Sequence, residues 1–285
     1  MMPDPRATAS LSLAFSREKG ERPMRLLRQD PPWRVVRAFQ TNGCECLVHI
    51  HNLSGGILSG DQLDLAVEVG AGSRVLLTST GATRIYKHRE DRFPASCRTR
   101  AFVGKNALLE YLPDQLIPYA DSRFVLDTKI ELAPEGAGLF WWETITSGRA
   151  GSGEKFSYAS LRISSTVSCC QRPIAIDQFV LEPSRRPIQR QGLLGEFACC
   201  STFYICKTGL ADGQWAKLQA VLEDEAEEQS TVHMQWGASC LVRDGIVVRG
   251  VGMEASQLLA GLSRFWTLAK FHLYGTEAVL PRKVY

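Results

Sequence analysis

The sequence predicts a mainly β protein of stacked, β-helix-like strands in one domain, residues 1–285, with two helices in its C-terminal third. Short runs that alternate apolar and polar residues follow one another at spacings of roughly 8–15 residues, which is typical of β architectures. A pattern of strand, glycine-containing corner and strand recurs at a period in the range of stacked repeats. Helical spacing of apolar residues is found late, after Asp212 and after Ser256.

Period-2 alternation identifies the strands. Between Leu63 and Val69, for example, apolar residues alternate with Asp64, Ala66 and Glu68, as in a half-buried strand. The predicted strands, in chain order, are Ser10–Phe15, Trp33–Gln40, Cys44–His51, Leu63–Val69, Arg74–Ser79, Cys97–Val103, Ala107–Leu112, Phe124–Leu132, Leu139–Thr146, Phe156–Val167 and Ile174–Leu181. No linker separates two cores, so one domain is expected.

A weak internal repeat has three copies. Ala66–Leu77 is echoed by Arg100–Glu110 and, more loosely, by Lys129–Phe140. Each copy is a strand, a corner and another apolar strand. The period indicates stacked units such as a β-helix or layered sheets, although any strand–turn–strand unit gives a similar pattern.

Two helices and a hairpin are predicted late in the chain. The first helix begins near Asp212, carries Trp215, Leu218, Leu222 and Ala226 on its apolar side, and ends in the acidic run 223–228. The second has Ser256 as its expected N-cap and Gly275 beyond its end. Between them, residues 240–243 and 246–250 are typical of a hairpin that turns at Asp244-Gly245.

Composition narrows the class of protein. Of 285 residues, 45% are hydrophobic and 22% charged, as in a globular protein with a sizeable core. The net charge of +3 is too small to favour nucleic acid, and no apolar run approaches the roughly 20 residues of a membrane span. The apolar patch Leu11–Phe15 is interrupted by serines, so a signal peptide is not expected. We therefore expect a cytoplasmic protein.

The nine cysteines indicate reduced thiols. They include no C-x-x-C pair, and the adjacent pairs Cys169-Cys170 and Cys199-Cys200 have a spacing that rarely gives a relaxed disulfide. Free thiols agree with a cytoplasmic location.

Cys44, Cys46, His49 and His51 form a candidate metal cluster. Successive side chains alternate faces on a strand, however, so the two cysteines point one way and the two histidines the other. The histidine pair could share a metal only with ligands from elsewhere. Structural thiols and ordinary histidines are the favoured interpretation.

The segment 148–155 resembles a phosphate-binding loop but lacks its chemistry. Such a loop needs Gly-Lys-Ser/Thr, whereas here Glu154 separates Gly153 from Lys155 and Phe156 replaces the hydroxyl. A nucleotide site is not predicted.

Three carboxylates lie on apolar strand faces. Glu143 shares a face with Leu139 and Trp141, while Glu110 and Asp177 are placed in the same way on other predicted strands. Because an unpaired buried carboxylate is costly, each is expected to pair with a cation, line a polar cavity or face solvent. Two such acids close together could also perform glycosidase chemistry.

Four motifs in order resemble the UreD (UreH) family of urease accessory proteins. They are Gly55-Gly56…Gly60-Asp61 followed by Thr78, Ala82-Thr83 and Tyr86; Leu109-Glu110-Tyr111-Leu112-Pro113-Asp114 with Ile117-Pro118 and Ser122-Arg123; Arg149…Gly153-Glu154 and Phe156; and Pro281-Arg282 after an aromatic-rich helix. Mild departures from the family pattern occur at Ser59, Gln115 and Arg84.

The resemblance implies a mainly β, non-enzymatic chaperone of urease maturation. Such a protein would bind apo-urease together with UreF and the GTPase UreG and help to deliver nickel, with no tightly bound cofactor and nickel only in transit. Our hypothesis is that Asp61, Glu143 and Asp177, and less strongly Glu110, line an internal path for Ni²⁺. Oxygen ligands hold this ion less tightly than imidazole or thiolate does. For each acid, the alternative to a place on the path is a buried ion pair. For the whole chain, the alternative function is that of a β-helical carbohydrate-active hydrolase that uses paired carboxylates.

Overall fold

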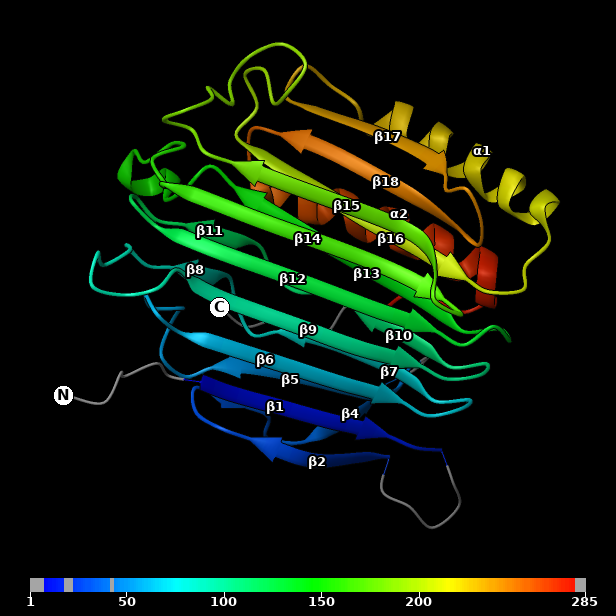
Figure 1. The fold of residues 1–285 in the computed structure, drawn as a ribbon. Coiled ribbons are helices and arrows are strands. Elements are labelled where there is room, and N and C mark those ends of the chain that lie inside the picture. The colour runs from blue at the N-terminus through cyan, green and yellow to red at the C-terminus, as the bar shows by residue number, and fades with distance from the viewer. Residues whose placement is uncertain (1–7, 18–22, 42–43, 280–285) are drawn as a thin grey trace.

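Two β-sheets stacked face to face, with two helices behind the second sheet, make up the protein (Figure 1). This computed structural model describes residues 8–17, 23–41 and 44–279. The two α-helices of this part of the chain are α1 (Asp212–Gln229) and α2 (Ala255–Tyr274). The predicted mainly β class with two late helices is confirmed.

The first sheet has seven strands. In spatial order they are β15 (Arg172–Leu181), β14 (Ser160–Cys169), β12 (Arg123–Leu132), β9 (Ala95–Val103), β6 (Gln62–Val69), β1 (Thr8–Phe15) and β2 (Met24–Gln29).

The second sheet has eleven strands. Its main path is β17 (Met234–Cys240), β18 (Gly245–Gly252), β16 (Cys199–Lys207), β13 (Gly138–Thr146), β10 (Leu108–Tyr111), β7 (Arg74–Ser79), β5 (Cys44–Asn52) and β3 (Trp33–Arg34), with β4 (Ala38–Thr41), β8 (Thr83–Ile85) and β11 (Leu116–Pro118) beside it.

The middle of the chain winds between the two sheets as a β-helix does. It passes from β6 to β7, from β9 to β10 and from β12 to β13, and the corresponding strands of successive turns pair in parallel. Ala66 lies opposite Arg100, which lies opposite Lys129. These are the first residues of the three repeat copies. Corresponding residues of the sequence repeat therefore pair with one another in the stacked strands.

Successive corners of this winding approach one another closely. A Cβ atom on Gly104 would lie 2.9 Å from the carbonyl oxygen of Val69 and 3.0 Å from the backbone nitrogen of Ala71. Only glycine leaves room for the backbone of the preceding corner at this distance. The glycine-containing corner of the repeat is therefore a packing requirement.

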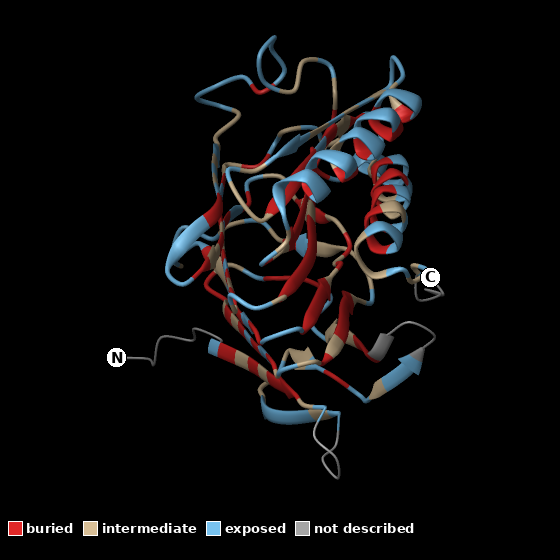
Figure 2. Ribbon diagram, turned by 90° about the vertical axis from the view of Figure 1, so that its right-hand side faces the viewer, coloured by how far each residue is buried: buried red, intermediate tan, exposed pale blue. Residues whose placement is uncertain are grey.

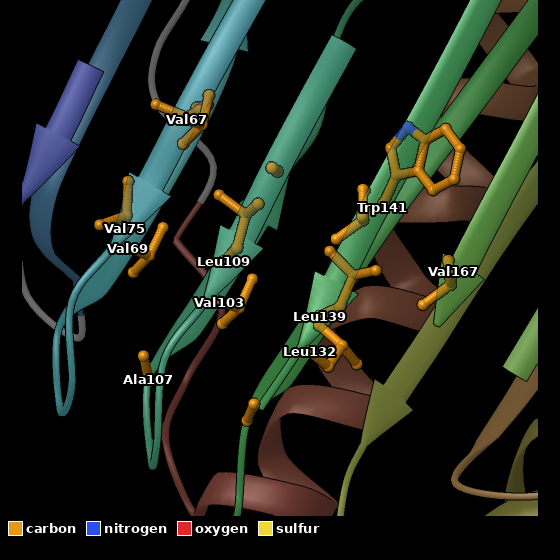
Figure 3. Close-up of a cluster of buried hydrophobic side chains, with 14 of the residues drawn as sticks. Val67, Val69, Val75, Val103, Ala107, Leu109, Leu132, Leu139, Trp141 and Val167 are labelled. Atoms are coloured by element: carbon orange, nitrogen blue, oxygen red, sulfur yellow. The ribbon is translucent and has the colours of Figure 1, made fainter. Parts of the chain in front are cut away.

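Apolar side chains fill the space on both sides of the second sheet. Between the sheets, residues such as Val69, Val103, Leu132 and Leu139 stack on one another from turn to turn (Figure 3). Behind the second sheet, a second cluster joins Phe140 and Phe203 to the buried stripe of α2. Figure 2 shows the outward faces of both helices as exposed and their inward faces as buried.

Several predicted boundaries are corrected. Glu254, not Ser256, is the N-cap residue of α2. The predicted strand 33–40 is split into β3 and β4. Phe156 has a φ of 51°, which a strand excludes, and β14 begins only at Ser160. The hairpin turn at Asp244-Gly245 is confirmed, but its first strand, β17, ends at Cys240, the first residue of the predicted segment 240–243.

Some elements have no counterpart among the predictions. The strands β2, β16 and most of β17 were not predicted, nor were the short strands β8 and β11. The C-terminal segment 280–285, with Pro281-Arg282, lies outside the described residues.

Candidate functional site: a polar layer between the sheets

A row of polar side chains crosses the apolar interior of the sandwich. On the first sheet Thr99, Thr128, Ser165 and Asp177 lie directly opposite one another on β9, β12, β14 and β15. On the second sheet Glu143, Thr202 and Arg249 are in register on β13, β16 and β18. We call these seven residues the polar layer.

Apolar residues flank this layer along the strands. On β12, for example, Phe124 lies on one side of Thr128 and Ile130 on the other, in two different hydrophobic clusters. On this strand, alternation therefore carries apolar side chains into the interior on both sides of Thr128. Polar groups inside a core are costly unless they are hydrogen-bonded, so such a row is unusual.

A cavity of about 830 Å³ lies at this level. Thr99, Thr128 and Glu143 of the polar layer line it, together with Tyr111 and Asp114. Its lining also includes Gly55, Thr80 and Arg84, which are exposed, so the cavity reaches the surface beside them. The wall is mostly apolar, and Thr99, Thr128 and Glu143 are among the polar groups in it. A space of this size is large enough for a small ligand or a hydrated ion.

Glu143 is the cavity carboxylate. Its Oε2 atom accepts a hydrogen bond of 3.1 Å from the Ser165 hydroxyl. Burial raises the pKa of Glu143 to about 7; the Ser165 hydrogen bond offsets part of this shift, and the negative charge of Asp177 adds to it. Among the described residues, no cation forms an ion pair with Glu143. It can therefore exchange a proton for another cation near neutral pH.

Asp177 ends the row and is already paired. Arg249 places Nη2 2.6 Å from both of its carboxylate oxygens, and the Tyr204 hydroxyl donates to Oδ2. Burial and the bond to Asp177 raise the pKa of Tyr204. For Asp177 an ion pair is thus the arrangement found, with the guanidinium of Arg249 exposed to solvent. Because Arg249 and Tyr204 belong to the second sheet, these contacts also join the edge strand β15 to that sheet.

Asp61 does not line the cavity. Its Oδ2 atom accepts the backbone N–H of Leu58 at 2.8 Å, and its carbonyl oxygen accepts the N–H of Ser96. Burial raises its pKa, opposed by the hydrogen bond from Leu58. Asp61 closes the turn that follows Gly55 and Gly56, next to the cavity entrance.

Gly56 brings that turn against the next strand. A Cβ atom at this position would lie 2.5 Å from the ring of Tyr86 and 2.7 Å from the carbonyl oxygen of Arg84. The neighbouring Ile57 exchanges backbone hydrogen bonds with Arg84 and Tyr86. Gly55 and Gly60 have φ values of 75° and 89°, in the region that favours glycine.

Glu110 lies on the other face of the second sheet. Its Oε1 atom is 2.8 Å from Nζ of Lys270, and its Oε2 atom accepts a bond of 2.6 Å from the indole nitrogen of Trp266. Burial raises the pKa of Glu110, and Lys270 opposes that shift. This acid is part of the contact with α2 and lies outside the cavity.

Other motif residues shape the cavity wall and its surroundings. The Pro113 carbonyl accepts the indole N–H of Trp142 at 2.8 Å, and Ser79 hydrogen-bonds both the backbone N–H and the carboxylate of Asp114. Burial raises the pKa of Tyr111, a cavity residue. Pro113 and Asp114 fill the break between β10 and β11.

The glycine-rich segment 148–156 folds as a closed loop around an ion pair. Arg149 pairs with Glu154, which also accepts the backbone N–H of Ala120 at 3.2 Å. Gly153 ends the short 3₁₀ turn Ala150–Ser152 with a φ of 73°. The carboxylate that breaks the phosphate-loop pattern thus holds the loop together.

Cys46 and His49 on β5 follow the expected alternation. Cys46 is buried between the sheets, and His49 makes an edge contact with Phe39 at a ring separation of 6.2 Å. Within the described residues, no three His, Cys, Asp or Glu side chains are placed to hold a metal ion.

Sequence reasoning missed most of the polar layer. Thr99, Thr128, Ser165 and Arg249 were not among the predicted site residues. A signal for two of them exists, because Thr99 and Thr128 occupy the same position in successive copies of the repeat, each one residue before its copy begins. Arg249 has no comparable signal, since its role depends on a contact across the two sheets.

Similarity to known proteins defines the class. The family model of the UreD urease accessory protein matches residues 7–285. The chain is 37% identical over 276 residues to the urease accessory protein UreD of Herpetosiphon aurantiacus, covering 96% of each chain. It is 36% identical to that of Alkalilimnicola ehrlichii, covering 96% of this chain and 89% of the relative, and 28% identical to that of Deinococcus radiodurans, covering 97% and 95%.

Because these matches extend over nearly the whole chain, the protein is a urease accessory protein. It belongs to the UreD family of urease accessory proteins. None of the helices in the described part of the chain has the length and apolar character required to cross a bilayer.

Proposed function

We propose that this chain is a non-catalytic chaperone of urease maturation in the cytoplasm. It binds apo-urease together with UreF and the GTPase UreG, and Ni²⁺ on its way to the urease active site passes through the polar layer. Family membership supports the maturation role. The observation that carries the nickel path is the cavity that reaches the surface with Glu143 in its wall, beside the hydroxyl groups of Thr99, Thr128 and Ser165.

The oxygen ligands in the cavity wall are suited to a Ni²⁺ ion in transit. Carboxylate and hydroxyl oxygens bind Ni²⁺ less strongly than imidazole nitrogen or thiolate sulfur does. A path must bind the ion well enough to admit it and weakly enough to release it. With a pKa near 7, Glu143 can lose its proton as the cation arrives and regain it when the cation leaves.

The acids of the path have different roles in this proposal. Glu143 contacts the passing ion, and Asp177 stands at the end of the row, where Arg249 holds it. Asp61 shapes the turn beside the cavity entrance. Glu110 has no part in the path, because Lys270 and Trp266 occupy its carboxylate.

The test replaces Glu143 in cells that also express urease and the other accessory proteins. We expect Glu143→Gln, which keeps size and the partner Ser165, to lower the nickel content of purified urease several-fold. The control is Glu68→Gln, because Glu68 is exposed on β6 at the outer face of the first sheet. Normal nickel content with folded Glu143→Gln protein would overturn the path.

A further inference from the structure

We propose that Arg249 is a positioning residue that withholds Asp177 from the passing cation, so that Glu143 meets the ion alone. This inference rests on the proposed nickel path. It assigns a role to an ion pair that would otherwise count only as a link between the sheets.

The carboxylates of Glu143 and Asp177 are neighbours, with Ser165 between them. The Ser165 hydroxyl donates to Glu143, and Ser165 lies directly opposite Asp177 in the antiparallel pair of β14 and β15. Side chains of directly opposed residues stand about 5 Å apart at Cβ. The negative charge of Asp177 accordingly contributes to the raised pKa of Glu143. Without Arg249 the pair would present two carboxylates to the same space.

Arg249 donates hydrogen bonds to both carboxylate oxygens of Asp177 from the solvent side. The Arg249 side chain is 54% exposed and that of Asp177 only 15%, so the guanidinium covers the carboxylate. Tyr204 donates from the interior side. Charge-assisted hydrogen bonds of this kind are stronger than neutral ones and fix the orientation of the carboxylate. Arg249 thereby balances the charge of Asp177 and holds its carboxylate in place.

The consequence for a divalent cation follows from charge and ligand number. Two carboxylates that share a space bind such an ion more tightly than one, because each adds a ligand and a negative charge. Tighter binding slows release. Arg249 therefore keeps the affinity of the polar layer in the range that transit requires.

The test compares Ni²⁺ binding to purified full-length variants by isothermal titration calorimetry. Arg249→Met keeps an unbranched apolar stem and removes the charge. We expect this variant to bind Ni²⁺ at least tenfold more tightly than the wild type. Arg249→Lys, which keeps the charge, should stay near the wild type. Asp177→Asn combined with Arg249→Met should return to the wild-type affinity, because the second carboxylate is gone.

Arg98→Met is the matched control. Arg98 has the same side-chain exposure of 54% and pairs with Asp64 on the outer face, away from the polar layer. The Arg98→Met variant should bind Ni²⁺ with the wild-type affinity. If Arg249→Met does not fold, Arg249→Gln carries the same expectation, because it also removes the positive charge that pairs with Asp177.

Urease activation in cells separates this inference from the proposed function. We expect Arg249→Met to lower the nickel content of urease because the ion is retained. If Glu143→Gln lowers nickel content while folded Arg249→Met matches the wild type in both assays, this inference is wrong and the path stands. If Glu143→Gln also has no effect, the path itself fails.

Discussion

Nζ of Lys270 on α2 lies 2.8 Å from Oε1 of Glu110 on β10, and the two side chains are only 2% and 0% exposed. Trp266, one turn earlier on the helix, donates to the other carboxylate oxygen. A buried pair of this kind fixes the position of the helix along the sheet. The glutamate of the Leu-Glu-Tyr-Leu-Pro-Asp motif therefore docks α2.

Breaking this pair is expected to be costly. Lys270→Met leaves the Glu110 carboxylate buried without its cation, which destabilises a protein by about 3–5 kcal/mol. Chemical denaturation, followed by tryptophan fluorescence, measures the loss. The double variant Glu110→Leu with Lys270→Met should recover much of it, with the indole N–H of Trp266 left unpaired at about 1–3 kcal/mol. Equal stability of wild type and Lys270→Met would contradict a buried charge pair.

Glu143 should make stability depend on pH. The folded protein keeps a proton on this carboxyl up to about pH 7, whereas the unfolded chain releases it near the ordinary value of 4.5. Stability therefore falls as pH rises between these values, by on the order of 3 kcal/mol, and stays lower above pH 7.

The measurement for Glu143 is thermal unfolding with a chelator present. Glu143→Gln cannot ionise, so its melting temperature relative to the wild type should be several degrees higher at pH 8 than at pH 5. Glu68→Gln, on the outer face, serves as the control and should show no such difference. The same relative melting temperature of Glu143→Gln at both pH values would show that the carboxyl is not buried as described.

Gly56 should tolerate no side chain. In Gly56→Ala the new Cβ would meet the Tyr86 ring and the Arg84 carbonyl, and relief requires a shift of the backbone. We expect a loss of roughly 1–3 kcal/mol in the free energy of unfolding. Gly81→Ala is the control, because nothing lies within 4 Å of its Cβ and its φ is not positive. Two variants of equal stability would mean that the turn is not packed on β8.

Thiol reactivity should separate the two members of the Cys169-Cys170 pair. Cys170 is exposed in the turn between β14 and β15, whereas Cys169 is buried and its pKa is raised by burial. With a thiol-specific chromogenic reagent on the folded protein, Cys170→Ser should remove one rapidly reacting thiol. Cys206→Ala should remove none, because Cys206 is fully buried. Loss of a fast thiol in Cys206→Ala would show that the second sheet opens there.

The sequence predicts well what depends on neighbours along the chain or on the repeat. Alternation locates most strands, and the match of Ala66, Arg100 and Lys129 anticipates their stacking. Boundaries fail where local geometry decides, as at Phe156 with its positive φ.

The partners of the buried acids could not be predicted in the same way. Lys270 is 160 residues from Glu110, and Arg249 is 72 residues from Asp177. Alternation shows that each acid faces an interior, but it does not show which cation the fold brings to it. Sequence therefore identified the acids, and the three-dimensional contacts distinguish Glu143 from the other candidates.

The most direct measurement of the central claim is the nickel content of urease made with and without this chain. Urease and the other accessory proteins are co-expressed in both cases, and nickel per active site is determined in the purified enzyme. We predict abundant apo-urease with little nickel when the chain is omitted, and restored nickel when it is supplied. Fully metallated, active urease in its absence would contradict the maturation role.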